Sequence, residues 1–201
     1  MEATWSGHGD IVQYLHQAGA DINIRAEWGY SALDQAAVNK HYPVCQYLVH
    51  AGADCSKAKD DILLLAADQG DLAMVQQMVT AGADVNKNNR QGDLPLSIAA
   101  DRGHLELCQW MVEAGADVTK APLLYCAALH GDLDLCQRWV QAGADINKRT
   151  IVGGFTPVNV AAKQGHYHLC EYFMNHGADL NIADKDGLTP LYFKALKMIH
   201  P

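Results

Sequence analysis

The chain has 201 residues, 49% of them hydrophobic, and a formal net charge of −8 at pH 7. This acidic balance argues against a general nucleic-acid binder, which needs a basic stripe. No apolar run is long enough to cross a membrane as a helix, so we expect no membrane insertion. The first residues, Met1-Glu2-Ala3-Thr4-Trp5, lack the basic and apolar regions of a secretory signal. We therefore expect a cytoplasmic protein in a reducing compartment.

The most informative feature of the sequence is a short motif, Ala-Gly-Ala-Asp, that recurs along the whole chain. Copies begin at residues 18, 51, 81, 114 and 142, and a copy at residue 176 has His in place of the first Ala. Most copies follow an Ala-Ala pair, a Gly-His or Gly-Asp step and an apolar segment, always in that order. A unit that repeats roughly every 30 residues is the signature of a stacked-repeat array.

Taken in chain order, the repeat divides residues 1–201 into one continuous array of units. A partial first unit contains one complete helix, from Asp10 to about Gln17. The predicted boundaries are 1–25 (partial), 26–57, 58–88, 89–120, 121–149, 150–183 and 184–201 (partial). The units starting at 58 and 121 lack turn residues, so their first helices should begin almost directly. Long turns, or fingers, are expected in the units starting at 26, 89, 150 and 184, which leaves two notches in the row of fingers.

The chain resembles the ankyrin-repeat family, whose unit is a hairpin turn followed by two helices and opens with Thr-Pro. Thr156-Pro157 and Thr189-Pro190 reproduce that opening, and Pro95 stands where a first helix begins. Lys40-His41 departs from the Gly-His step, which puts that turn in question. The resemblance implies an all-α solenoid with short β-hairpin fingers, some of them shortened. It also implies a module that binds proteins, without catalytic residues, metal or cofactor.

Histidine and cysteine recur four residues apart, a spacing that places both side chains on one helix face and could begin a metal site. The pairs are His41–Cys45, His104–Cys108 and His166–Cys170. Valine fills the cysteine position in two other units, however, and aspartate fills the histidine position in two. We therefore favour a buried core thiol and a helix-capping position. On this interpretation Cys45, Cys108, Cys136 and Cys170 are buried, reduced and metal-free.

Residues that follow each Ala-Ala pair should face the concave surface, where ankyrin arrays usually hold their ligands together with the fingertips. Candidate partner-binding residues on the concave face are Asn39, Gln69, Asp101, Arg102, Leu129, His130 and Lys163. Candidates on the fingertips are Trp28, Tyr30, Arg90 and Phe155. For any one residue, an ordinary solvated surface is an equally good interpretation. An aromatic strip on the second helices (Tyr14, Tyr47, Trp110, Trp139 and Tyr172) is either core or a second interface.

The sequence thus predicts a monomeric module that binds a partner protein or peptide on its concave face. The alternative is a targeting or substrate-recruiting segment of a larger multidomain enzyme or of a host-directed effector. Asn23 also resembles the asparagine that is hydroxylated in ankyrin arrays of animal cells, so it is a candidate modification site.

Overall fold

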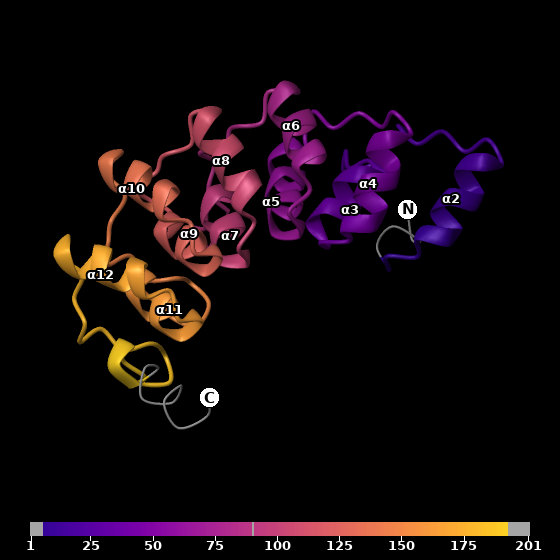
Figure 1. Ribbon diagram of the computed structural model, residues 1–201. Coiled ribbons are helices and arrows are strands. Elements are labelled where there is room, and N and C mark those ends of the chain that lie inside the picture. The colour runs from indigo at the N-terminus through magenta and orange to yellow at the C-terminus, as the bar shows by residue number, and fades with distance from the viewer. Residues whose placement is uncertain (1–5, 90, 193–201) are drawn as a thin grey trace. The chain divides into compact units, whose positions relative to one another are not determined.

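The computed structural model describes residues 6–89 and 91–192, and in that part of the chain all regular structure is helical. The all-α class is therefore confirmed. The chain falls into two compact units, residues 1–91 and 92–201. In each of them, successive helices are joined by tight turns into antiparallel pairs (Figure 1).

Unit 1 contains one second helix and two complete helix pairs. Its helices are α2 (Gly9–Gln17), α3 (Ala32–Val38), α4 (Tyr42–His50), α5 (Lys59–Gln69) and α6 (Leu72–Thr80). The first helices α3 and α5 pack against each other, and each packs against its own second helix. α2 packs against α4, so the end of the chain is covered by the next repeat.

Among its described residues, unit 2 contains three helix pairs built in the same way, followed by the start of a further helix at 190–192. Its helices are α7 (Pro95–Arg102), α8 (Leu105–Glu113), α9 (Leu123–His130), α10 (Leu133–Gln141), α11 (Pro157–Gln164) and α12 (Tyr167–Asn175). The first helix α9 packs against both α7 and α11. The Ala-Ala pairs allow this close approach, because their small side chains are almost fully buried, except for that of Ala162, which is partly exposed.

Helix starts differ between the histidine and aspartate units. Asp71 and Asp132 accept hydrogen bonds from the backbone N–H of Met74 and Leu135 at 2.9 Å each, as N-cap residues do. The histidines at the equivalent position, His41, His104 and His166, make no such side-chain cap. The predicted capping role is thus confirmed for the aspartates and wrong for the histidines.

The turn between α3 and α4 keeps its shape although Lys40 replaces the usual glycine. Lys40 has φ 61°, in the left-handed region where the equivalent Gly70 has φ 73°. The N–H of His41 donates to the carbonyl of Ala36 at 2.9 Å, and the N–H of Lys40 donates to that of Ala37 at 3.0 Å. Both bonds of the glycine-type helix end are therefore formed, at the expense of a strained lysine backbone.

The shared cysteine position lies in the core, with one exception. Cys45, Cys108 and Cys136 are completely buried, like Val75 at the same position, and all are free thiols. Cys170 is only half-buried, which corrects the expectation for that residue. It lies on α12, after which no further second helix is described that would cover it.

The finger lengths follow the prediction. The turn at 26–30 is closed by hydrogen bonds from the N–H of Ala26 to the carbonyl of Tyr30 (2.9 Å) and from that of Gly29 to Ala26 (2.8 Å). The turn at 184–188 is closed in the same way. These are single closed turns, and no strand occurs among the described residues. The shortened units have no finger, because α5 begins at Lys59 and α9 at Leu123. The fingertip candidate Arg90 and residues 193–201 of the last partial unit lie outside the described residues.

Candidate functional site

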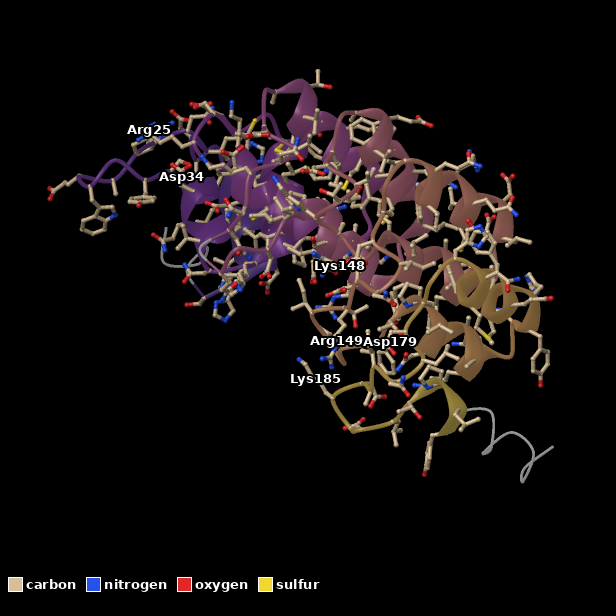
Figure 2. All side chains as sticks on the ribbon, turned by 90° about the vertical axis from the view of Figure 1, so that its left-hand side faces the viewer. Arg25, Asp34, Lys148, Arg149, Asp179 and Lys185 are labelled. Atoms are coloured by element: carbon tan, nitrogen blue, oxygen red, sulfur yellow. The ribbon has the colours of Figure 1, made fainter. Side chains whose placement is uncertain are left out.

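In unit 1 the side chains of Arg25 and Lys57 hold the finger at 26–30 in place. Arg25 donates to the carbonyl of Gly29 at 3.2 Å, and it forms ion pairs with Asp34 (3.1 Å) and Asp54 (2.9 Å). Figure 2 shows Arg25 beside Asp34 at the base of this finger. Lys57 adds a second donor to the same Gly29 carbonyl at 3.1 Å. The finger is therefore rigid without help from its own aromatic residues.

The two aromatic residues of this finger project into solvent. Trp28 is 72% exposed and Tyr30 is 46% exposed. A buried tryptophan side chain usually stabilises a fold. Trp28 contributes little stabilisation of this kind, because most of its surface is exposed. The fingertip candidate Trp28 thus stays accessible at the surface.

The two concave-face candidates of unit 1 are bonded within their own helices. Asn39 donates its side-chain amide to the carbonyl of Gln35 at 2.8 Å, at the end of α3. Gln69 is exposed and donates to Asp68 at 3.0 Å. The Asn39 side chain thus bonds the end of its own helix, whereas the Gln69 side chain is exposed at the surface.

In unit 2 the segment between α10 and α11 bends over the first helices. We refer to residues 150–155 as the 150–155 loop. The N–H of Ile151 donates to the Asp101 carboxylate at 2.9 Å, and the N–H of Val152 lies 3.4 Å from the same oxygen. Asp101 belongs to α7, so the loop reaches past the shortened unit of α9 to the helix pair before it.

Phe155 closes this loop against α9 and α11. Its ring stacks on Tyr125 with 6.3 Å between centroids, and the Lys163 ammonium lies 4.8 Å from its ring centroid. Phe155 is half-buried as a result. Unlike the fingertip residue Trp28, Phe155 therefore packs against its own fold and does not project freely into solvent.

The remaining unit 2 candidates lie at the ends of α7 and α9. Arg102 and His130 are exposed, and the His130 Nδ1 lies 2.9 Å from the Cys126 carbonyl oxygen. Leu129 is half-buried and approaches Gly103 so closely that a β-carbon there would be 2.9 Å from the leucine. The structure thus joins Asp101, Phe155 and Lys163 through one loop, while Arg102 and His130 lie exposed at the ends of α7 and α9.

The electrostatics of this loop centre on Asp101. Burial raises its pKa from 3.8 to about 6, a shift that Asp93 also favours, although the N–H groups of Ile151 and Val152 oppose it. The second carboxylate oxygen is buried and has no hydrogen-bond partner. Burial and the nearby Asp101 charge likewise raise the pKa of Tyr125.

Sequence reasoning missed several residues of this surface: Tyr125, Arg149, Ile151, Val152 and Lys185. Arg149 donates to the carbonyls of Gly154 and Ala183 at 3.0 Å each, and the Lys185 ammonium donates to that of Ile151 at 2.8 Å. The available signal was the extra residue in this finger together with the shortened finger before it. Both features leave the loop room to cross α9.

Three of the buried cysteines, Cys45, Cys108 and Cys136, are poorly suited to act as nucleophiles. Burial raises the pKa of Cys45 and of Cys136 to about 12, so both are protonated thiols at neutral pH. A hydrogen bond with Cys126, together with burial, raises the pKa of Cys108. Among the described residues, no group of three His, Cys, Asp or Glu side chains is arranged to hold a metal ion. None of the described helices is long and apolar enough to span a membrane.

The aromatic strip of the second helices is not uniform. Trp139 is buried, whereas Tyr14 is 71% exposed. Tyr47, Trp110 and Tyr172 are half-buried, and Tyr47 makes a 2.8 Å hydrogen bond with His16. Core packing thus accounts for Trp139 and partly for the middle members, but not for Tyr14.

Comparison with known proteins agrees with the helix-pair architecture. A family model described as ankyrin repeats (3 copies) matches residues 1–60, 54–122 and 123–200. The mitochondrial disaggregase of Bos taurus is 37% identical over 94 residues, which is 45% of this chain and 14% of that protein. The human ankyrin repeat and KH domain-containing protein 1 is 33% identical over 98 residues, 46% of this chain and 4% of that protein. Protein phosphatase 1 regulatory subunit 27 of Mus musculus is 38% identical over 60 residues, 30% of this chain and 39% of that protein. The matched segment is therefore less than half the length of each of these relatives.

Proposed function

Because this chain belongs to the ankyrin-repeat family, whose repeats are generally protein–protein interaction modules, we propose that it binds a partner protein or peptide. The binding surface on this proposal comprises the exposed side of the first helices and the fingers beside them. Affinity comes from a few anchoring side chains on a rigid surface rather than from the total area of contact.

The exposure of Trp28 is the observation that supports this proposal most directly. It is 72% exposed on a finger that Arg25 and Lys57 already hold in place. An exposed tryptophan on a rigid turn brings a large contact area and loses little conformational entropy on binding. Tryptophan is also among the residues most enriched at binding hot spots.

Affinity capture from cells, followed by mass spectrometry, tests this proposal with paired variants. Trp28→Ala should lose the partner that the unmodified protein captures, while Glu27→Ala, an exposed change on the same finger, should keep it. Circular dichroism checks that both variants are folded. Identical captured sets for both variants would remove Trp28 from the binding surface and leave the aromatic strip as the place to search.

A second candidate function is that of a segment within a longer protein, where the chain recruits substrates or targets that protein to its place in the cell. The observation in its favour is that the matched segment is 14% of the disaggregase and 4% of the human KH-domain protein. Immunoblotting of source cells with an antibody against this chain measures the size of the native product. A product no larger than 21.9 kDa would exclude this candidate.

We place the protein in the cytoplasm as a monomer, in keeping with its free cysteines, of which Cys45, Cys108, Cys126 and Cys136 are buried. Fractionation of source cells, thiol titration of the native material and light scattering after gel filtration test the three parts of this statement separately. A secreted, disulfide-linked or dimeric product would each contradict the corresponding part.

A further inference from the structure

The 150–155 loop is held in a single conformation by this chain alone. Asp101 accepts the N–H of Ile151, while the N–H of Thr150 donates to the carbonyl of Phe155 at 2.9 Å. The Thr150 hydroxyl donates to the carbonyl of Val152 at 2.7 Å, and the N–H of Phe155 donates to that hydroxyl at 2.9 Å. A loop ordered in this way loses little further entropy when a partner binds.

The consequence of this conformation is an apolar pair that points into solvent. The backbone N–H groups of Ile151 and Val152 face Asp101, whereas their side chains are 46% and 65% exposed. Both residues are β-branched and therefore stiff at χ1. The fold does not bury these side chains, although it fixes the backbone that carries them.

Two cations flank this apolar pair. Arg149 and Lys185 are exposed, and both donate to backbone carbonyls of the loop. Figure 2 shows them together on one side of unit 2, with Lys148 nearby. Arg25, Lys120 and Arg138 form ion pairs with carboxylates, whereas among the described residues Arg149 and Lys185 form none. Their positive charge is thus solvated by carbonyl dipoles and water and remains available to an acidic group.

The sequence around the loop is unusually poor in acidic residues for a chain of net charge −8. Between Asp145 and Asp179, Glu171 is the single acidic residue, while Lys148, Arg149 and Lys163 lie in the same stretch. Asp184 is buried and accepts the N–H groups of Asp186 and Leu188. Asp179 and Asp186 are exposed acidic residues of the following segment, so the positive charge at the loop comes from Arg149 and Lys185 themselves and not from a uniformly basic surface.

From this juxtaposition of a rigid apolar pair and two available cations, we propose that the 150–155 loop, Arg149 and Lys185 form a docking surface for an acidic peptide segment. The segment places an apolar side chain against Ile151 and Val152 and its carboxylates near Arg149 and Lys185. A polyanion such as nucleic acid would use the cations but gain nothing from the apolar pair. The inference rests on the proposed protein-binding function and names the chemistry of the partner and a second contact region.

Selection from a random-peptide phage library on the immobilised protein tests the inference, with synthetic copies of the enriched peptides measured by fluorescence polarisation. Enriched peptides should carry net negative charge and a large apolar residue. Their affinity should fall by roughly tenfold or more in Val152→Ser and in Lys185→Gln, and it should weaken as salt rises. Lys185→Arg, which keeps the charge, should retain most of the affinity.

The chain offers matched control positions on the second helices, outside the proposed binding surface. Ile11 on α2 is 45% exposed, close to the exposure of Ile151, and Arg138 on α10 is an exposed cation. Ile11→Ser and Arg138→Gln should leave peptide affinity unchanged. Circular dichroism melting of all variants identifies any that are unfolded, and Lys185→Arg remains as the test of charge in that case.

Three results would overturn the inference. The first is enrichment of neutral or basic peptides, or of none above the level seen on Val152→Ser. The second is an affinity that Val152→Ser and Lys185→Gln leave intact. The third is a single-stranded oligonucleotide that binds as tightly as the peptides and independently of Val152. If the affinity of the peptides depends on Trp28 and not on Val152 or Lys185, this inference is wrong, whereas the proposed protein-binding function stands.

Discussion

Replacing Asp101 with Asn should make the stability of unit 2 less dependent on pH. The side chain is partly buried beneath the 150–155 loop, and its pKa is about 6 instead of 3.8. An asparagine at this position keeps an oxygen that can accept the N–H of Ile151, so the loop retains its main attachment. The variant therefore removes the ionisation and preserves the hydrogen bond.

The sign of the effect follows from the raised pKa. Well below pH 3.8 the carboxyl is neutral in both the folded and the unfolded chain, and it adds no penalty. As pH rises to about 6, the unfolded chain releases the proton before the folded chain does, so the wild-type protein loses stability. Above about pH 6 the carboxylate is ionised in both states, and the loss stays constant.

The size of the effect follows from the pKa difference. Two pKa units correspond to at most about 3 kcal/mol. Because Asp101 is only partly buried, solvent screening reduces this value, and we expect about 1–1.5 kcal/mol. The free energy of unfolding of Asp101→Asn relative to wild type should therefore rise by this amount between about pH 4 and pH 7.

Urea unfolding at several pH values measures this difference, with the fluorescence of Trp110 and Trp139 reporting on unit 2. Asp134→Asn is the matched control, because Asp134 is exposed and pairs with Arg138 on the same helix. Its difference from wild type should show no comparable rise. A flat difference for Asp101→Asn, or a wild-type protein that gains relative stability as pH rises, would refute the assignment of Asp101 as a buried, penalised charge.

Four further predictions concern single residues. Lys40→Gly should stabilise the protein by about 0.5–1 kcal/mol in thermal unfolding, because it removes left-handed strain, while Lys40→Ala should not. Trp28→Ala should leave the melting temperature unchanged and weaken partner binding by about 2 kcal/mol or more, as measured by calorimetry. Cys136→Ser should destabilise by about 1–3 kcal/mol and the half-buried Cys170→Ser by less, and equal losses in denaturant melts would contradict this. If the source is an animal, mass spectrometry of native material should find hydroxylation at Asn23, and only unmodified peptide would count against it.

The repeated motifs predict the helices because each repeat carries its own start and stop signals. The expected helix from Asp10 to Gln17 is observed as Gly9–Gln17, and Pro95 opens α7 as predicted. The shortened fingers before α5 and α9 also follow directly from missing residues. These features depend on local sequence alone, so six copies of the same pattern define them well.

The 150–155 loop could not be predicted because it departs from the repeat. Its attachment to Asp101 joins residues far apart in sequence, and no second copy of the pattern exists to compare with it. Phe155 is a turn residue by position, yet Tyr125 on α9 gives it a stacking partner that periodicity does not indicate. By contrast, the turn at Lys40 keeps the usual geometry although lysine replaces glycine, because both closing hydrogen bonds join backbone groups.

The attachment of the 150–155 loop to α7 also affects how unit 2 unfolds. In a repeat array, stability is usually the sum of each repeat's own contribution and its coupling to the adjacent repeat. The bond between Ile151 and Asp101 skips the repeat of α9 and adds a next-nearest-neighbour coupling. We therefore expect α7, α9 and α11 to lose amide hydrogen-exchange protection as one cooperative block, without fraying repeat by repeat from one end.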